Sequence, residues 1–352
     1  MSASRSASER RGQRWSPSFG FWTVAFAFLI VMASATLPSP LYGLYRERDH
    51  LSAFTITIIY AIFAAGAIGS LIVDRFVVAR FGRRGAMLGA VSSMMLSAGV
   101  LAAWKDLPGL LIGRLLTGVA AGLAAGTAIV YLIELRLLAN PAASVVRART
   151  VGTSVNVGAL GIGPLMAGCL AQWAPWPLAL SYLILLGLGA LTVLGLLATP
   201  ETGQPALPIA SAIQARGSRR SSRPPAPAAA AACAAFAANG LFAGLSGLFL
   251  ATTLHHPSHA LAGAALCLVF SSGVVSQLAT TTLPASRVLA VGTSSMLAGL
   301  VLLATAVRLA SPSLVLFLVG GALIGAGAGA VFKGTTGLVL ESSAPVDRVD
   351  DI

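Results

Sequence analysis

The amino-acid sequence predicts an all-α fold, a polytopic membrane protein built as a bundle of about ten transmembrane helices. Of the 352 residues, 56% are hydrophobic and only 10% are charged, and the mean hydropathy is +0.85. A soluble domain carries about 25% charged residues, so this chain has too little charge to cover a water-facing surface. Most of its charged residues also lie between long apolar runs.

Ten apolar stretches are long enough to cross a bilayer as helices, which takes about 20 residues each. The predicted spans are 19–42, 52–73, 85–104, 108–134, 150–172, 177–199, 228–253, 259–280, 286–307 and 313–338. Short polar connections join most of them, but one connection is long. The chain is therefore expected to consist of an N-terminal tail (1–18), a six-helix half (19–199), a basic linker (200–227) and an incomplete four-helix half (228–352).

The loops between the spans differ in charge. If the N-terminus is cytoplasmic, the cytoplasmic segments carry sixteen basic residues and the opposite loops carry four. Because Lys and Arg accumulate on the cytoplasmic side, we expect both termini in the cytoplasm of a bacterial cell, with the chain in the inner (plasma) membrane. The linker contains four arginines and several prolines, a composition typical of a flexible connection.

The sequence also contains a weak internal repeat. A shift of 207 residues places Gly118 on Gly325, Gly122 on Gly329, and span four on span ten. Duplicated helical halves are typical of transporters, which bind substrate near the bilayer midplane between the halves. Two glycine-rich spans can also align by chance. Spans five and six, shifted by 207, would fall at 357–406, so the repeat predicts that two of twelve helices are missing at the C-terminus.

Several other classes of protein are not expected. The net charge of +12 and the pI of about 11.0 would suggest a nucleic-acid partner in a soluble chain, but these basic residues lie in membrane loops. The three cysteines lie in apolar runs, and a histidine cluster near 255–259 lacks carboxylate or cysteine partners. We therefore expect no nucleic acid, no metal, no cofactor and no enzymatic activity.

A charged motif follows span two. Its arginines surround a glycine, Gly82, which suits a tight turn, and its charges can bond carboxylates and helix ends. The motif resembles the cytoplasmic loop signature of the major facilitator superfamily of transporters. Ordinary positive-inside charges are the alternative. The motif residues are Gly69, Asp74, Arg75, Arg80, Gly82, Arg83 and Arg84.

Arg114 lies six residues into span four, where an arginine is costly and normally faces a bundle interior or an aqueous cavity. With Gly118 four residues later, it resembles the fourth-helix motif of the same superfamily, which implies a part in proton coupling or in balancing substrate charge. Snorkelling to the outer interface is the alternative.

Span five is rich in small residues around one proline. Small residues permit close helix approach, and proline interrupts the backbone hydrogen bonds of a helix. The pattern is similar to a fifth-helix signature found in antiporters of the superfamily. Its residues are Gly158, Gly161, Gly163, Pro164 and Gly168.

Five further polar or charged residues are candidates for a substrate cavity or a proton path. Tyr42 closes span one in a way that looks like a group of bacterial drug-efflux facilitators, although it could instead be an interfacial anchor. Polar amides more often join helices than line cavities, and a lysine near a helix end can snorkel. The five are Tyr42, Asn156, Asn239, Gln277 and Lys333.

The resemblance implies a carrier that works by alternating access of two six-helix halves. Taken with the motifs, it favours proton-coupled export of a hydrophobic or amphipathic small molecule by a monomer embedded in membrane lipid. Two alternatives remain open at this point. One is uptake of a sugar, an organic acid or an osmolyte, and the other is a degenerate fragment that does not transport.

Overall fold

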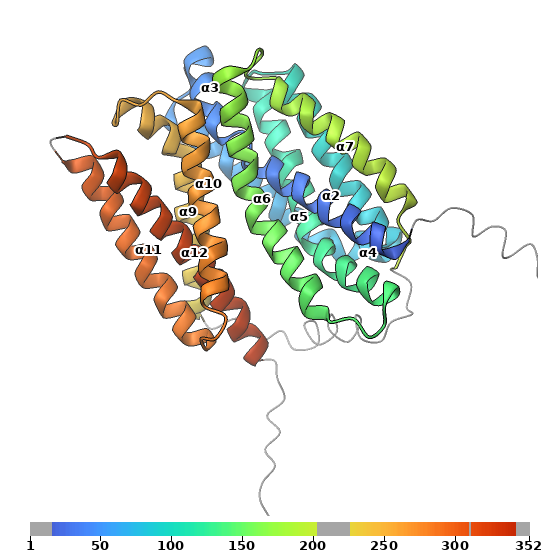
Figure 1. Ribbon diagram of the computed structural model, residues 1–352. Coiled ribbons are helices and arrows are strands. Elements are labelled where there is room, and N and C mark those ends of the chain that lie inside the picture. Colours follow the sequence, from blue (N-terminus) through green and yellow to red (C-terminus); the bar gives the residue numbers. More distant parts are fainter. Residues whose placement is uncertain (1–15, 203–225, 310, 343–352) are drawn as a thin grey trace, which may run out of the picture. The chain divides into compact units, whose positions relative to one another are not determined.

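The computed structural model describes residues 16–202, 226–309 and 311–342. Within these ranges every regular element is a helix (Figure 1). The chain divides into two compact units, Met1–Leu207 and Pro208–Ile352. This confirms the prediction of an all-α helical membrane fold.

The helices of the first unit begin with α2 and end with α7. They are α2 (Pro17–Thr36), the short 3-10 helix η1 (Ser39–Leu41), α3 (Tyr42–Asp49), α4 (Ala53–Ala103), α5 (Leu107–Ala139), α6 (Val145–Trp173) and α7 (Leu180–Ala198). The second unit contains α9 (Ala226–Thr252), α10 (His259–Ala279), α11 (Ala285–Arg308) and α12 (Leu314–Ser342).

Nine helices in the described ranges are long and apolar enough to cross a membrane. One of them, α4, has 51 residues, and at 1.5 Å per residue it would span roughly 76 Å, more than twice the ~30 Å hydrocarbon core. Its backbone breaks at Gly82, so it crosses twice. The described part of the chain therefore makes ten passes, as the sequence predicts.

The two limbs of α4 run in opposite directions along α5. Going down the first limb, Phe63 packs on Gly118 and Asp74 packs on Gly126, so this limb is parallel to α5. On the second limb, the Ser97 hydroxyl donates to the carbonyl of Gly113 over 2.7 Å, and the Ser93 hydroxyl donates to that of Leu116 over 2.9 Å. This limb is antiparallel to α5.

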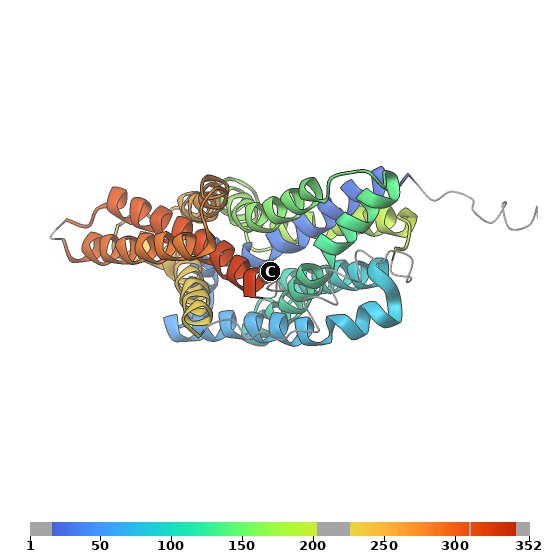
Figure 2. The same ribbon diagram turned by 90° about the horizontal axis from the view of Figure 1, so that it is seen from below.

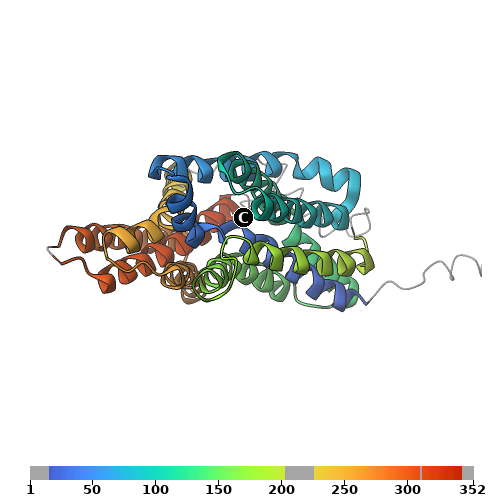
Figure 3. The same cartoon turned by 90° about the horizontal axis from the view of Figure 1, so that it is seen from above.

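End-on views show the helices of the first unit in two rows (Figures 2 and 3). One row contains α4 and α5, and the other contains α2, α6 and α7. The rows meet where α2 packs on α5 and where α4 packs on α7. The spans that contain α2 and α5 are the most buried of the unit. In the second unit α12 holds the corresponding place, because α9, α10 and α11 all pack against it.

The outer faces of the spans carry large, exposed apolar side chains. Ile72, Leu194 and Val301, for example, are all well exposed. In water such a surface would promote association. Against lipid tails it costs nothing, because lipid is as apolar as the side chains.

Two expected boundaries were wrong. Span one was predicted to run through residue 42, but α2 ends at Thr36 because Pro38 and Pro40 cannot continue it, and Tyr42 begins the separate helix α3. The segment 74–84 was predicted to be a loop. It is helical on both sides of Gly82, since a charged sequence can continue a helix when its carboxylates and cations have partners.

Candidate functional site

The turn at Gly82 organises one end of the first unit. Gly82 has φ 75° and ψ −179°, a positive-φ conformation that is essentially confined to glycine and costs other residues about 1–3 kcal/mol. A Cβ at this position would also collide with the carboxylate of Glu201. Only glycine therefore allows the chain to reverse here while Glu201, which follows α7, lies directly against the turn.

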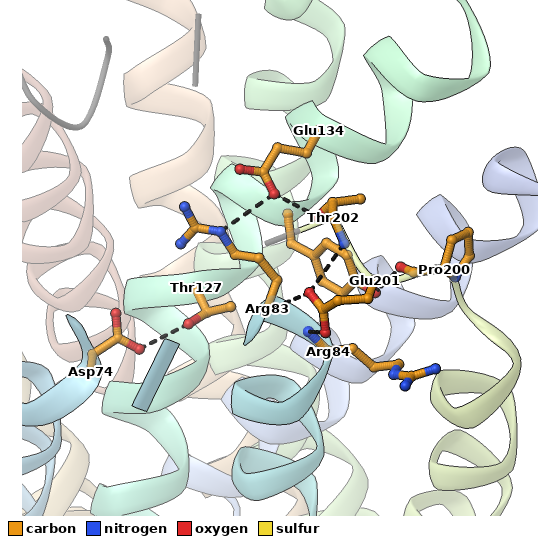
Figure 4. Close-up of polar contacts among 9 residues, drawn as sticks. Asp74, Arg83, Arg84, Thr127, Glu134, Pro200, Glu201 and Thr202 are labelled. Atoms are coloured by element: carbon orange, nitrogen blue, oxygen red, sulfur yellow. Dashed lines mark hydrogen bonds and ion pairs between the residues drawn. The ribbon is translucent and has the colours of Figure 1, made fainter. Parts of the chain in front are cut away.

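Glu201 caps the second limb of α4. Its two carboxylate oxygens accept the backbone N–H of Arg83 over 2.8 Å and that of Arg84 over 3.1 Å (Figure 4). These N–H groups belong to the first turn after the break, where a helix lacks internal acceptors and favours negative charge. From the sequence, Glu201 falls in the linker that follows span six (200–227), because nothing local shows that a distant helix needs it.

A buried ion pair extends this cap to α5. Arg83 Nε lies 3.4 Å from Glu134 Oε2, and both side chains are about 5% exposed. The Thr202 hydroxyl donates to the same oxygen of Glu134 over 2.6 Å, and the Tyr131 hydroxyl donates to the carbonyl of Pro200 over 2.7 Å. Figure 4 shows these groups converging from α4, α5 and the segment after α7.

Asp74 bonds to a different part of α5. It is buried, and its Oδ1 accepts the Thr127 hydroxyl over 2.8 Å. Arg75 and Arg80 are exposed, and Arg75 lies over the ring of Phe76. The predicted motif thus separates into a buried set, Asp74 with Arg83, and an exposed set. Gly69 has open space where its Cβ would be.

Arg114 is completely buried within the first unit. Its Nη1 donates to the carbonyl of Ala35 over 2.7 Å. Ala35 lies in the last turn of α2, where carbonyls have no helical partner and where positive charge is favourable. Arg114 therefore does not snorkel to an interface; it caps a helix that the prolines end inside the bundle.

Aromatic rings surround the rest of the guanidinium. Its central carbon lies 4.4 Å from the ring centre of Phe63 and 5.1 Å from that of Tyr60. Tyr42 packs edge-on against Tyr60 and is an electrostatic neighbour of Arg114, and the Tyr60 hydroxyl bonds to Ser39. Arg114 Nε and Nη2 make no hydrogen bond of normal geometry to the described residues. The Tyr42 hydroxyl, which is also buried without a hydrogen bond of normal geometry to the described residues, is a polar group within reach of the guanidinium.

The proline of α6 is compensated from α2. Pro164 has no N–H, so the carbonyl of Leu160 loses its helical donor. The Thr36 hydroxyl donates to that carbonyl over 2.8 Å. Gly163 lies so close to α2 that a Cβ would collide with the carbonyl of Ala33. Gly161 and Gly168 are also buried, whereas Gly158 faces open space.

The repeat predicted from the sequence has a counterpart in the packing. A Cβ on Gly118 would meet the carbonyl of Phe63, and a Cβ on Gly325 would meet that of Val269. Gly118 lies on span four and faces span two, and Gly325 lies on span ten and faces span eight. The repeated close approach follows the 207-residue shift to within one residue.

Lys333, in the second unit, bonds to the end of α10. Its Nζ donates to the carbonyl of Gln277 over 2.6 Å and lies 3.4 Å from the Thr280 hydroxyl. These groups are in and after the last turn of α10, so a helix cap accounts for the charge. Asn239 Oδ1 is buried without a hydrogen-bond partner in the described ranges, and Asn156 is half-buried.

Comparisons with known proteins agree with this architecture. The model of the Major Facilitator Superfamily matches residues 24–349. Among solved structures, a crystal structure of a mutant of the nucleoside transporter NupG matches with a TM-score of 0.65 and 13% sequence identity, covering 93% of this chain and 90% of that chain. At that identity the likeness concerns the fold alone. A search of curated proteins found no match.

Proposed function

This chain belongs to the major facilitator superfamily, and on that premise we propose that it is a secondary active transporter that moves a small molecule by alternating access. Its proposed task is proton-coupled export of a hydrophobic or amphipathic compound. The observation that carries the proposal is Arg114, a fully buried charge in an apolar bundle. Charges at such positions mark substrate and ion pathways.

The surroundings of Arg114 suit an amphipathic ligand. Its Nε and Nη2 are available as donors, and the rings of Tyr60 and Phe63 supply apolar faces beside them. A guanidinium does not release its proton in proteins. Arg114 would therefore act on proton coupling through its field, by lowering the proton affinity of any carrier group that approaches it.

The pairing of α2 with α6 supports export. Pro164 removes one backbone hydrogen bond from α6, and the carbonyl of Leu160 loses its helical donor. The Thr36 hydroxyl on α2 donates to that carbonyl instead. The antiporter-like arrangement of these residues favours exchange of a compound against protons. The direction of transport rests on this resemblance and on the closing segment of span one near Tyr42.

The network around Glu201 and Glu134 supports rocking of a rigid half. All of its described partners lie in the first unit: Arg83 and Arg84 on α4, Glu134 on α5 and Thr202 after α7. Alternating access moves one half against the other largely as rigid bodies. Bonds that tie three helices together let the first unit move without deforming.

The charge distribution supports an orientation. The end of the first unit with Arg83, Arg84 and Arg136 would face the cytoplasm of a bacterial cell, with both termini on that side. The protein would work as a monomer in the inner membrane.

Transport by inside-out membrane vesicles tests the proposal. With the vesicle lumen made acidic, we expect vesicles that contain the full chain to accumulate chloramphenicol, a neutral amphipathic probe, and to lose it when an ionophore collapses the pH gradient. Vesicles without the chain set the background. Absence of proton-driven accumulation of chloramphenicol, and of ethidium as a second probe, would overturn the export proposal and leave a chain that does not transport or that takes up substrate.

Uptake is the rival function, and a nucleoside is the probe that the structural match suggests. Right-side-out vesicles given uridine test it directly. Uridine entry driven by an inward proton gradient, together with no export of either amphipathic probe, would assign the chain to uptake.

A further inference from the structure

A pocket at one end of the first unit takes no part in the proposed transport. It lies where α2 begins, α5 ends and α6 begins, and its cavity volume is about 40 Å³. That is far below the volume of a ligand pocket that encloses a whole small molecule, so the pocket has room for a polar group but not for a whole lipid or drug. It is lined by Ser18, Phe21, Trp22, Leu135, Arg136, Ala139 and Arg147.

The lining is strongly positive. Arg136 enters from the last turn of α5 and Arg147 from the first turn of α6, and none of the seven lining residues is acidic. Glu134, two positions before Arg136, is already bonded to Arg83 and Thr202. The two arginines therefore face the pocket without a carboxylate among its walls.

The Nε–H donor of Arg136 is unpaired: it is buried and has no hydrogen-bond partner within the described part of the chain. A buried donor without an acceptor is unfavourable, and an arginine presents a rigid fork of donors that matches phosphate oxygens. An anion in the pocket would satisfy this donor and balance both charges.

Two helix starts add to the positive field. Ser18 belongs to the first turn of α2, and Arg147 belongs to the first turn of α6. Helix N-termini direct N–H groups and partial positive charge at an anion. Phosphate is the anion that combines strong acceptor oxygens with the charge such a site favours.

The rim of the pocket indicates how the anion is carried. Trp22, in the lining, is 59% exposed, and the neighbouring Phe19 and Val146 are 43% and 69% exposed. Exposed tryptophan beside apolar side chains is typical of the headgroup level of a bilayer. A phosphate group that reaches the pocket from the bilayer belongs to a phospholipid.

We infer that this pocket binds the phosphate group of an anionic phospholipid. Arg136 and Arg147 bind the phosphate, and Trp22 with Phe21 packs on the glycerol and upper acyl chain. Basic pockets between helices on the cytoplasmic side are known to suit such headgroups. The inference does not depend on which compound the chain transports, or on whether it transports one.

Native mass spectrometry of the purified full chain tests the site. We compare the binding of phosphatidylglycerol with that of phosphatidylcholine of the same acyl chains. We expect the wild type to retain phosphatidylglycerol in preference, and Arg136→Gln combined with Arg147→Gln to weaken that binding about tenfold or more. Arg149→Gln is the matched control, because it removes one exposed charge from the same helix outside the pocket. Arg136→Lys with Arg147→Lys should restore most of the preference.

Other outcomes separate the sources of phosphate. If inorganic phosphate displaces phosphatidylglycerol at low millimolar concentration, a free phosphate is the ligand and the lipid is not. If Arg149→Gln weakens binding as much as the double variant, the attraction is diffuse and the pocket is not a site. If the double variant does not fold, the wild type alone still tests the inference. Phosphatidylglycerol should raise its midpoint of thermal unfolding more than phosphatidylcholine does. An equal effect of the two lipids would overturn the inference.

Discussion

Arg114 Nη1 donates a hydrogen bond of 2.7 Å to the carbonyl of Ala35, so a buried charge on α5 caps the C-terminal end of α2. Two roles, structural and functional, meet in this side chain. One donor closes α2, and under the proposed function two others, Nε and Nη2, would bind the substrate. The two roles can be separated by substitution, because a lysine can keep the cap but not the fork of donors.

Arg114→Ala should abolish proton-coupled transport while leaving insertion into the membrane intact. It should also lower the free energy of unfolding by about 1–3 kcal/mol, because the carbonyl of Ala35 loses its donor. Arg114→Lys should recover most of the stability but little of the transport. Vesicle transport and thermal unfolding in detergent measure the two effects. If transport recovers in step with stability in Arg114→Lys, the role of Arg114 is structural. Unimpaired transport by Arg114→Ala would contradict the role of Arg114 in proton coupling and substrate binding.

Thr36 and Pro164 should be energetically coupled. Thr36→Val leaves the carbonyl of Leu160 without a donor and should cost about 0.6–2 kcal/mol. In a Pro164→Ala background the restored N–H can bond that carbonyl, so the same Thr36→Val change should cost much less. Thr36→Ser, which keeps the hydroxyl, serves as the control. A double-mutant cycle by thermal unfolding measures the coupling, and additive effects would show that the bond contributes nothing.

Gly82→Ala should destabilise the first unit strongly. The backbone conformation alone costs about 1–3 kcal/mol for a residue other than glycine, and the new Cβ would also push Glu201 from the backbone that it caps. Gly69→Ala is the matched control on the same helix, because its Cβ would meet open space and alanine favours a helix by up to ~1 kcal/mol. Thermal unfolding should separate the two variants in opposite directions. Equal stability of both would mean that the turn at Gly82 is not as described.

Glu201→Gln should loosen the start of the second limb of α4. The amide keeps the shape of the side chain but loses the negative charge that favours a helix N-terminus, which is worth about 0.3–1 kcal/mol. It also replaces one of the two acceptor oxygens by an NH2 group, which cannot accept a backbone N–H. Backbone hydrogen exchange near Arg83 and Arg84 should speed up while exchange in the middle of α5 stays unchanged. Glu47→Gln, on the short helix α3, is a suitable control. Unchanged exchange at Arg83 would contradict the capping role.

The spans were predictable because a bilayer sets a minimum apolar length, and that length is written directly in the sequence. The burial of Arg114 was also open to prediction, since a charge so deep in a span must face the bundle. The tight turn at Gly82 was predicted as well, but the helical structure on both sides of it was not. Charged residues before and after the glycine resembled a loop, whereas the partners that let them continue as helix lie on α5 and after α7.

The partners of the motif residues could not be read from the sequence. Thr36, Thr127 and Thr202 carry no local signal, because a threonine in an apolar helix usually bonds its own preceding turn. The need for a donor at Leu160 does follow from Pro164 alone. Which side chain supplies it depends on the packing of α2 against α6, and that is a property of the folded unit.

The contact of Glu201 with the turn at Gly82 has a mechanical consequence. Glu201 lies in the segment that follows α7 and leads along the chain toward the second unit, and its carboxylate is bonded to the backbone N–H groups of Arg83 and Arg84. A force transmitted along the chain toward α7 is therefore borne in part by the hydrogen bonds between Glu201 and the second limb of α4. The strain is shared among several helices, and the sixth span is protected from being drawn out of register.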